Sequence, residues 1–141
     1  GKNSFAFLFD MNVLFEKFIA KAIKSIDSNA KIQNQNSFGS LVLKPDIISD
    51  NQIIDTKYKK IKSLEDLKQS DKLQAFAYGI NYDLKNVMLL YPKHLDDVNK
   101  ELFLGENENK ICLKVNSIDL NFDGSSKEFI EEIKRRLERI L

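Results

Sequence analysis

The stretch between residues 45 and 60, PDIISDNQIIDTKYKK, constrains the possible folds of this chain more strongly than any other. Its central residues 50–51, Asp-Asn, suit a tight turn, and apolar and polar residues alternate on either side. A hairpin with this turn places Asp46 directly opposite Asp55. Because side chains alternate along a strand, Lys57 joins them on the same face. The sequence therefore predicts a β-hairpin that brings two carboxylates and an amine together.

The opposite face of the predicted hairpin is apolar, as expected when one side of an antiparallel sheet packs on a core. Its apolar residues are Leu41, Leu43, Ile47, Ile54 and Tyr58. Directly opposed like charges destabilise a sheet, so the two aspartates need a compensating cation, and a hard divalent metal is the natural candidate. The alternative is a solvated surface hairpin whose Asp and Lys residues have no function.

An amphipathic helix is predicted before the hairpin, from Met11 to Ile26, with Asp10 as its N-cap. Glu16 does not fit the polar side of this helix. At 100° per residue it lies about 20° from Ile23, inside the apolar stripe. Its carboxylate either reaches out to solvent or a lysine at the edge of the stripe, or points to the two aspartates of the hairpin.

A second helix is predicted from Ser70 to Tyr82, with Ser70 as its N-cap. The apolar positions expected to be buried are Leu73, Phe76, Ala77 and Ile80. A more polar face carries, at spacings of three and four, Asp71, Gln74 and Tyr78. The apolar run 87–91, ended by Pro92, predicts a buried strand. A helix that connects the hairpin to this strand implies a crossover, with a mixed sheet as the result.

Residues 30–36 are a polar strand candidate, and Gly39 marks a turn, so we expect three strands in an antiparallel meander. Gln33 and Gln35 would share one face of the first strand. They either line a site or belong to a polar edge strand.

The remaining third of the chain is less informative. His94, the only histidine, lies in a polar loop and is expected to be incidental. Residues 95–110 are expected to form a variable connection. Residues 111–115 and 118–122 predict edge strands or one interrupted strand. Ser125 opens a capping box, which predicts a C-terminal helix.

Composition narrows the class of protein. The 141 residues suffice for one domain, and the formal charge of +1 offers no overall field for nucleic acid or membrane. Cys112 is the only cysteine, which excludes an internal disulfide and suits the cytoplasm, and it is expected to be a small core residue. No apolar stretch approaches the roughly 20 residues that span a bilayer, so no membrane association is expected.

Four separated motifs carry a resemblance to a known family. They are FDMNVLFEKF at 9–18, PDI at 45–47, IDTKYK at 54–59 and QAFAY at 74–78. Acidic residues, a lysine and a glutamine in the order αβββαβ resemble the PD-(D/E)XK nucleases. The motifs look like the nuclease part of the McrC family, the cleavage subunit of McrBC-type restriction systems, over about residues 5–92.

The resemblance implies an α/β fold, a PD-(D/E)XK restriction-endonuclease-like core with a mixed central sheet flanked by helices, plus a C-terminal helix. Residues 1–141 would form a single nuclease domain. It would be the C-terminal catalytic part of a longer subunit, because the family's upstream region that engages the partner is absent from this sequence.

The resemblance also implies roles for individual residues. The Mg²⁺ ligands would be Asp46, Asp55 and the backbone carbonyl of Thr56, with Mn²⁺ able to substitute. Lys57 would orient or deprotonate the attacking water and stabilise the developing charge. Glu16 would hold a metal-bound water or a second ion, and Gln74 would position the site. The residues expected to contact DNA are Lys59, Lys60, Lys62 and Tyr78.

The function that the resemblance implies is cleavage of double-stranded DNA in a modification-dependent, 5-methylcytosine-type restriction system. A separate McrB-like AAA+ GTPase would drive it, and GTP would bind only to that partner. Two alternatives stay open. One is another nuclease of the superfamily, such as a RecB-like repair exonuclease or a junction resolvase. The other is a non-catalytic module that keeps the fold and binds DNA or a partner.

Overall fold

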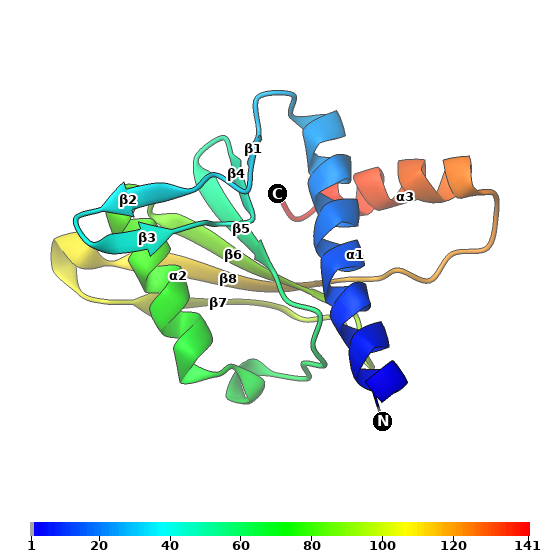
Figure 1. Ribbon diagram of the computed structural model, residues 1–141, viewed down its shortest axis with the longest axis horizontal. Coiled ribbons are helices and arrows are strands. Elements are labelled where there is room, and N and C mark those ends of the chain that lie inside the picture. The colour runs from blue at the N-terminus through cyan, green and yellow to red at the C-terminus, as the bar shows by residue number, and fades with distance from the viewer. Residues whose placement is uncertain (1) are drawn as a thin grey trace.

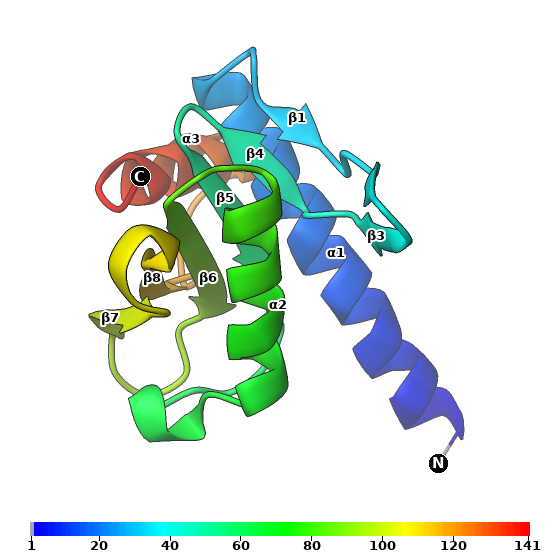
Figure 2. The ribbon, with the colours of Figure 1, turned by 90° about the vertical axis from the view of Figure 1, so that its left-hand side faces the viewer.

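A mixed six-stranded sheet lies at the centre of the fold, with helices on both faces (Figures 1 and 2). The computed structural model describes residues 2–141, and the side chains of residues 11–141. The strands lie in the order β1 (Lys31–Ile32), β4 (Ile47–Ser49), β5 (Gln52–Thr56), β6 (Asn86–Pro92), β8 (Ile111–Ile118) and β7 (Asn99–Leu104). A separate two-stranded sheet contains β2 (Asn36–Phe38) and β3 (Leu41–Leu43).

The helices divide the core into two layers. Helices α1 (Lys2–Ile26) and α3 (Ser126–Glu138) cover one face of the large sheet, and α2 (Gln69–Asn81) covers the other (Figure 2). Two short 3-10 helices are η1 (Leu64–Asp66) and η2 (Asn107–Asn109). The mixed α/β architecture with a C-terminal helix is confirmed.

The predicted hairpin is confirmed in its turn and its register. Ser49 pairs with Gln52 and Ile47 with Ile54, so the turn consists of residues 50–51. Asp50 has a φ of 50°, the left-handed conformation that aspartate tolerates in tight turns. Ile47 and Ile54 are fully buried against α1. Because successive side chains of β5 point to opposite faces of the sheet, a strand that carries an aspartate still belongs to the core.

The crossover is also confirmed. Strand β6 runs parallel to β5, and β8 runs parallel to β6. Side chains of β6 alternate between the two cores, Met88 and Leu90 toward α1 and Val87 and Leu89 toward α2. A strand covered on both faces reads as a continuous apolar run, which is why the sequence identified it.

Both predicted helix starts need correction. Helix α1 begins at Lys2, so Asp10 lies inside the helix and is not its N-cap. No glycine or proline interrupts residues 2–26, and nothing therefore stops the helix at Asp10. Helix α2 begins at Gln69 with Lys68 at the N-cap position, so Ser70 belongs to its first turn.

The buried face of α2 was predicted only in part, because Phe76 and Ile80 pack against the core as expected but Leu73 does not. Leu73 is 60% exposed, whereas the buried residues are Asp71, Ala75, Tyr78 and Gly79. A Cβ at Gly79 would lie 2.8 Å from the Ile111 side chain, so the helix approaches the sheet through its small residues. Close approach turns Asp71 and Tyr78 inward and leaves Leu73 outside.

The expected antiparallel arrangement of three strands is present, in the order β1, β4 and β5, but the hairpin of β2 and β3, which was not predicted, interrupts it. Strand β1 pairs with β4, while β2 and β3 pair only with each other. Gln33, with a φ of 52°, turns the chain out of the large sheet, and Pro45 separates β3 from β4. Leu41 is consequently 45% exposed and does not belong to the core.

Three expectations for the C-terminal third also need correction. The segment expected to be a connection contains β7, which pairs antiparallel to β8. Strand β8 is continuous and lies between β6 and β7, so it is not an edge strand. Cys112 is half buried, and its Sγ donates to Glu101 Oε1 at 2.9 Å. The N-cap of α3 is confirmed, because Ser125 Oγ accepts a hydrogen bond from Glu128 N.

Candidate active site

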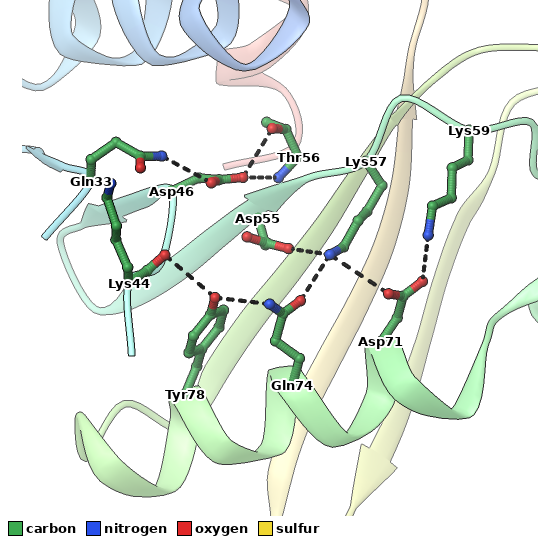
Figure 3. A network of polar contacts seen from close by, with 10 residues as sticks. All are labelled: Gln33, Lys44, Asp46, Asp55, Thr56, Lys57, Lys59, Asp71, Gln74 and Tyr78. Atoms are coloured by element: carbon green, nitrogen blue, oxygen red, sulfur yellow. Dashed lines mark hydrogen bonds and ion pairs between the residues drawn. The ribbon is translucent and has the colours of Figure 1, made fainter. Parts of the chain in front are cut away.

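The acidic and basic residues of the hairpin meet α2 where β5 ends (Figure 3). Asp55 points from β5 toward α2, is 4% exposed, and lies 2.7 Å through Oδ2 from Lys57 Nζ. Burial and the neighbouring Asp46 carboxylate raise the pKa of Asp55 to about 7, although Lys57 opposes the shift. A buried carboxylate that favours its neutral form needs a further cation in order to ionise fully.

Asp46 lies directly before β4 and binds the end of β5. Its Oδ2 accepts hydrogen bonds from Thr56 N at 2.8 Å and Thr56 Oγ1 at 3.0 Å. Its Oδ1 accepts from Gln33 Nε2 at 3.1 Å. These three bonds orient the carboxylate, as binding a ligand with fixed geometry requires.

Lys57 is the centre of the polar network in Figure 3. Its Nζ donates to Gln74 Oε1 at 2.8 Å and lies 3.6 Å from Asp71 Oδ1, in addition to the contact with Asp55. Burial alone would lower the pKa of Lys57, but the carboxylates of Asp55, Asp71 and Asp46 outweigh burial and raise the pKa. The residue therefore carries an ammonium group in the arrangement seen here.

The polar face of α2 supplies the other half of the site. Gln74 Nε2 donates to Tyr78 OH at 3.0 Å, and Tyr78 OH donates to the Lys44 carbonyl at 3.4 Å. Asp71 lies between two lysines, because its Oδ2 is 3.4 Å from Lys59 Nζ. The sequence placed Asp71 on this face but did not identify it as a site residue. Its spacing from Gln74 and Tyr78 was the available signal.

Glu16 reaches the site through Gln33 rather than directly. Gln33 Nε2 donates both to Glu16 Oε1 and to Asp46 Oδ1. Burial, followed by the Asp46 carboxylate, raises the pKa of Glu16. Of the two roles open to Gln33, lining the site is the one that the structure shows. The sequence left this role of Gln33 undecided, because its left-handed backbone is not evident from the local pattern.

The donor set was compared with what Mg²⁺ requires. Within the part of the chain that the structure describes, no group of three or more His, Cys, Asp or Glu side chains is arranged to hold a metal ion. Two neighbouring carboxylates, Asp46 and Asp55, are present. Mg²⁺ keeps several waters and binds through one or two carboxylates, so this oxygen-rich pair fits Mg²⁺ rather than a softer metal.

The lysines expected to contact DNA lie after β5. Lys59 pairs with Asp71, whereas Lys60 and Lys62 are exposed. Tyr78, expected to contact DNA, is 4% exposed and belongs to the core cluster beside α2. In this structure Tyr78 therefore supports Gln74 and offers little surface to a ligand.

Comparisons with known proteins agree with the family that the sequence motifs indicated. The family model described as McrBC 5-methylcytosine restriction system component matches residues 1–92. The fold is similar to a chain in a solved structure of Thermococcus gammatolerans McrB AAA+ hexamers with bound McrC, with a TM-score of 0.64 and 16% identity. That match covers 93% of this chain and 33% of the other, so this chain spans about a third of the similar one.

Two negative findings complete the comparison. No curated protein matches the chain. Among the described residues, none of the helices has the length and apolar character needed to cross a membrane. The family model covers well over half of the 141 residues, and the resemblance to McrC is confirmed: the chain belongs to the McrBC restriction system component family.

Proposed function

We propose that this chain is a Mg²⁺-dependent DNA endonuclease domain with a PD-(D/E)XK core. The observation that carries the proposal is the buried Asp55, placed between the Lys57 ammonium and a second carboxylate, Asp46, whose hydrogen bonds fix its orientation. Burial beside a second carboxylate, which raises the pKa of Asp55, is an arrangement that recurs at functional sites. The reaction class is hydrolysis of a phosphodiester.

The proposed role of each residue follows from its position in the candidate active site. Asp46, Asp55 and the Thr56 carbonyl would hold the ion, which when bound supplies a more acidic water and a positive charge beside the phosphate. Lys57 stabilises the negative charge that develops on the phosphate. Its raised pKa favours this electrostatic role over proton abstraction. Gln74 holds the Lys57 ammonium, and Glu16 with Gln33 would orient a water beside Asp46.

The proposed partner is an McrB-like AAA+ GTPase, with GTP bound only by that subunit. Membership of the McrBC family and the similarity to a chain in an assembly of McrB hexamers with McrC support this partner. The family description also supports a substrate that contains 5-methylcytosine. Double-stranded DNA would reach the site while the partner uses GTP.

The test is cleavage of methylated DNA by the full-length protein with its GTPase partner, Mg²⁺ and GTP. Asp55→Asn should lower the rate at least about 100-fold, because it removes charge from the ion site while keeping the shape of the side chain. Asp83→Asn is the matched control, since Asp83 is exposed in the loop after α2. It should cut at the rate of the unmodified protein.

Two results would overturn the proposal. Full cleavage by the Asp55→Asn variant would remove the ion site from the mechanism. A folded, partner-bound protein that retains DNA but never cuts it would identify a non-catalytic binding module.

A further inference from the structure

A basic cavity lies beside the candidate active site and outside the residues assigned to catalysis. Its volume is about 320 Å³, and its lining residues are Tyr58, Lys59, Lys60, Pro92, Lys93 and His94. Ligand pockets range from roughly 300 to 1,000 Å³, so this one is suited to a small group such as a phosphate with part of its sugar. No acidic side chain within residues 11–141 lines it.

The cavity is formed by the ends of two parallel strands. Thr56 of β5 pairs with Leu90 of β6, and Lys57 N donates to the Leu90 carbonyl at 2.9 Å. The segments 58–60 and 92–94 therefore leave the same carboxyl edge of the sheet. In α/β sheets this edge is where ligands bind. The candidate active site lies at the end of the same strand, β5.

Contacts with residues outside the cavity hold its walls in place. The Tyr58 ring contacts the buried Phe15 ring, with 5.8 Å between centroids. Lys93 N donates to the Ile118 carbonyl at 2.8 Å. Rigid walls lower the cost of ordering a ligand.

The positive charges of the cavity lysines are only partly compensated by nearby carboxylates. Lys93 Nζ lies 3.7 Å from Asp97 and 4.0 Å from Asp119, distances typical of weak surface pairs. Lys60 makes no ion pair with the described part of the chain. Lys59 pairs with Asp71, which also contacts Lys57. Asp71 thus links the cavity to the candidate active site.

We infer that this cavity binds a backbone phosphate of the DNA strand, next to the phosphate that is cleaved. The inference rests on the proposed function, which supplies the DNA and its position. Lysine ammonium groups bind phosphate as point charges, and the His94 ring adds a further N–H donor. Tyr58 offers an apolar surface to the sugar. Contacts of this kind position a strand without reading its sequence.

The test measures binding of the full-length protein to a short fluorescent DNA duplex in EDTA, at several salt concentrations between about 50 and 200 mM. Lys60→Gln with Lys93→Gln should weaken binding about tenfold. The slope of log K against log[salt] should fall by about one, because both lysines hold the same phosphate. The matched control, Lys85→Gln with Lys110→Gln, removes two exposed charges near the opposite edge of the sheet and should leave the slope unchanged.

Two results would overturn the inference. An unchanged slope means that the cavity holds no phosphate, and a fall of about two means that the lysines make separate surface contacts. Thermal unfolding of each variant shows that it is folded.

The proposed function is judged independently by Asp55→Asn. Normal DNA binding by the cavity variant, with cleavage that depends on Asp55, would reject the cavity alone. Weakened binding, with no cleavage by the unmodified protein, would reject only the nuclease.

Discussion

At the scale of single residues, the site is a balance of charges in a buried place. Asp46 and Asp55 repel each other, and Lys57 compensates for part of that repulsion. Asp71 adds a third carboxylate beside the Lys57 ammonium and is only 7% exposed. Each of these charges is tolerable because the others are near. Removing one therefore changes the electrostatic environment of the rest.

The raised pKa of Asp55 predicts how stability depends on pH without metal. The pKa of Asp55 is about 7 in the folded protein and has its ordinary value of 3.8 in an unfolded chain, so the folded state binds more protons between these values. The free energy of unfolding should fall as pH rises from about 4 to about 7, by up to about 1.4 kcal/mol per pH unit from this residue. The measurement is urea unfolding in EDTA across that range.

The Asp55→Asn variant isolates this contribution. Glu16, whose pKa is also raised, acts in the same direction and stays in both proteins. The variant should therefore lose part of the pH dependence, and its stability relative to the unmodified protein should improve toward pH 7. Parallel curves for the two proteins would show that Asp55 has an ordinary pKa.

At the scale of elements, the orientation of α2 is set by the close approach of its small residues and by Tyr78, and not by Leu73. Ala75 and Gly79 allow close contact with the sheet, and Tyr78 fills the space beside them. This orientation directs Asp71 and Gln74 toward Lys57. The packing of a glycine thus determines where the Gln74 amide of the candidate active site lies.

Two substitutions test the orientation of α2. Gly79→Ala should lower the free energy of unfolding by about 1 to 2 kcal/mol, because the new methyl group would overlap the Ile111 side chain and the Leu84 carbonyl. Leu73→Ala, at a 60% exposed position, should change stability by less than about 0.5 kcal/mol. Chemical denaturation measures both.

The opposite ranking would contradict the structure. If Leu73 faced the core, as the apolar spacing predicted, its truncation would cost about 2 to 5 kcal/mol. Gly79→Ala would then stabilise the helix, because alanine is the better helix former.

At the scale of the whole molecule, the site joins parts of the chain that are far apart in sequence. Helix α1 supplies Glu16, the turn after β1 supplies Gln33, the hairpin supplies Asp46 and Asp55, and α2 supplies Gln74. These parts meet only when the sheet and both cores have formed. Anything that binds across them should therefore stabilise the entire fold.

Mg²⁺ provides that test. At ten times its dissociation constant it should stabilise the full-length protein by about 1.4 kcal/mol, or about 3 to 5 °C in Tm. The increase should be larger at pH 8 than at pH 6, because protons compete for Asp55 below its pKa of about 7. Thermal unfolding with Na⁺ at equal ionic strength corrects for salt. An equal increase in the Asp46→Asn and Asp55→Asn variants would place the ion elsewhere.

Local interactions explain what the sequence determined by itself. The hairpin register follows from a two-residue turn and an alternating pattern, the buried β6 from its continuous apolar run, and the start of α3 from Ser125. The motifs around Glu16, Asp46, Asp55 and Gln74 also identified the family.

Tertiary structure decided what depends on partners distant in the chain. The inward face of α2 depends on the approach of Gly79 to Ile111, and the pairing of the polar β7 depends on β8. The roles of Gln33 and Asp71 depend on where α1, β5 and α2 meet. Short-range patterns specify which atoms a segment presents. Packing between segments decides which of those atoms face the candidate active site, because the free energy of burial depends on the neighbour and not on the segment alone.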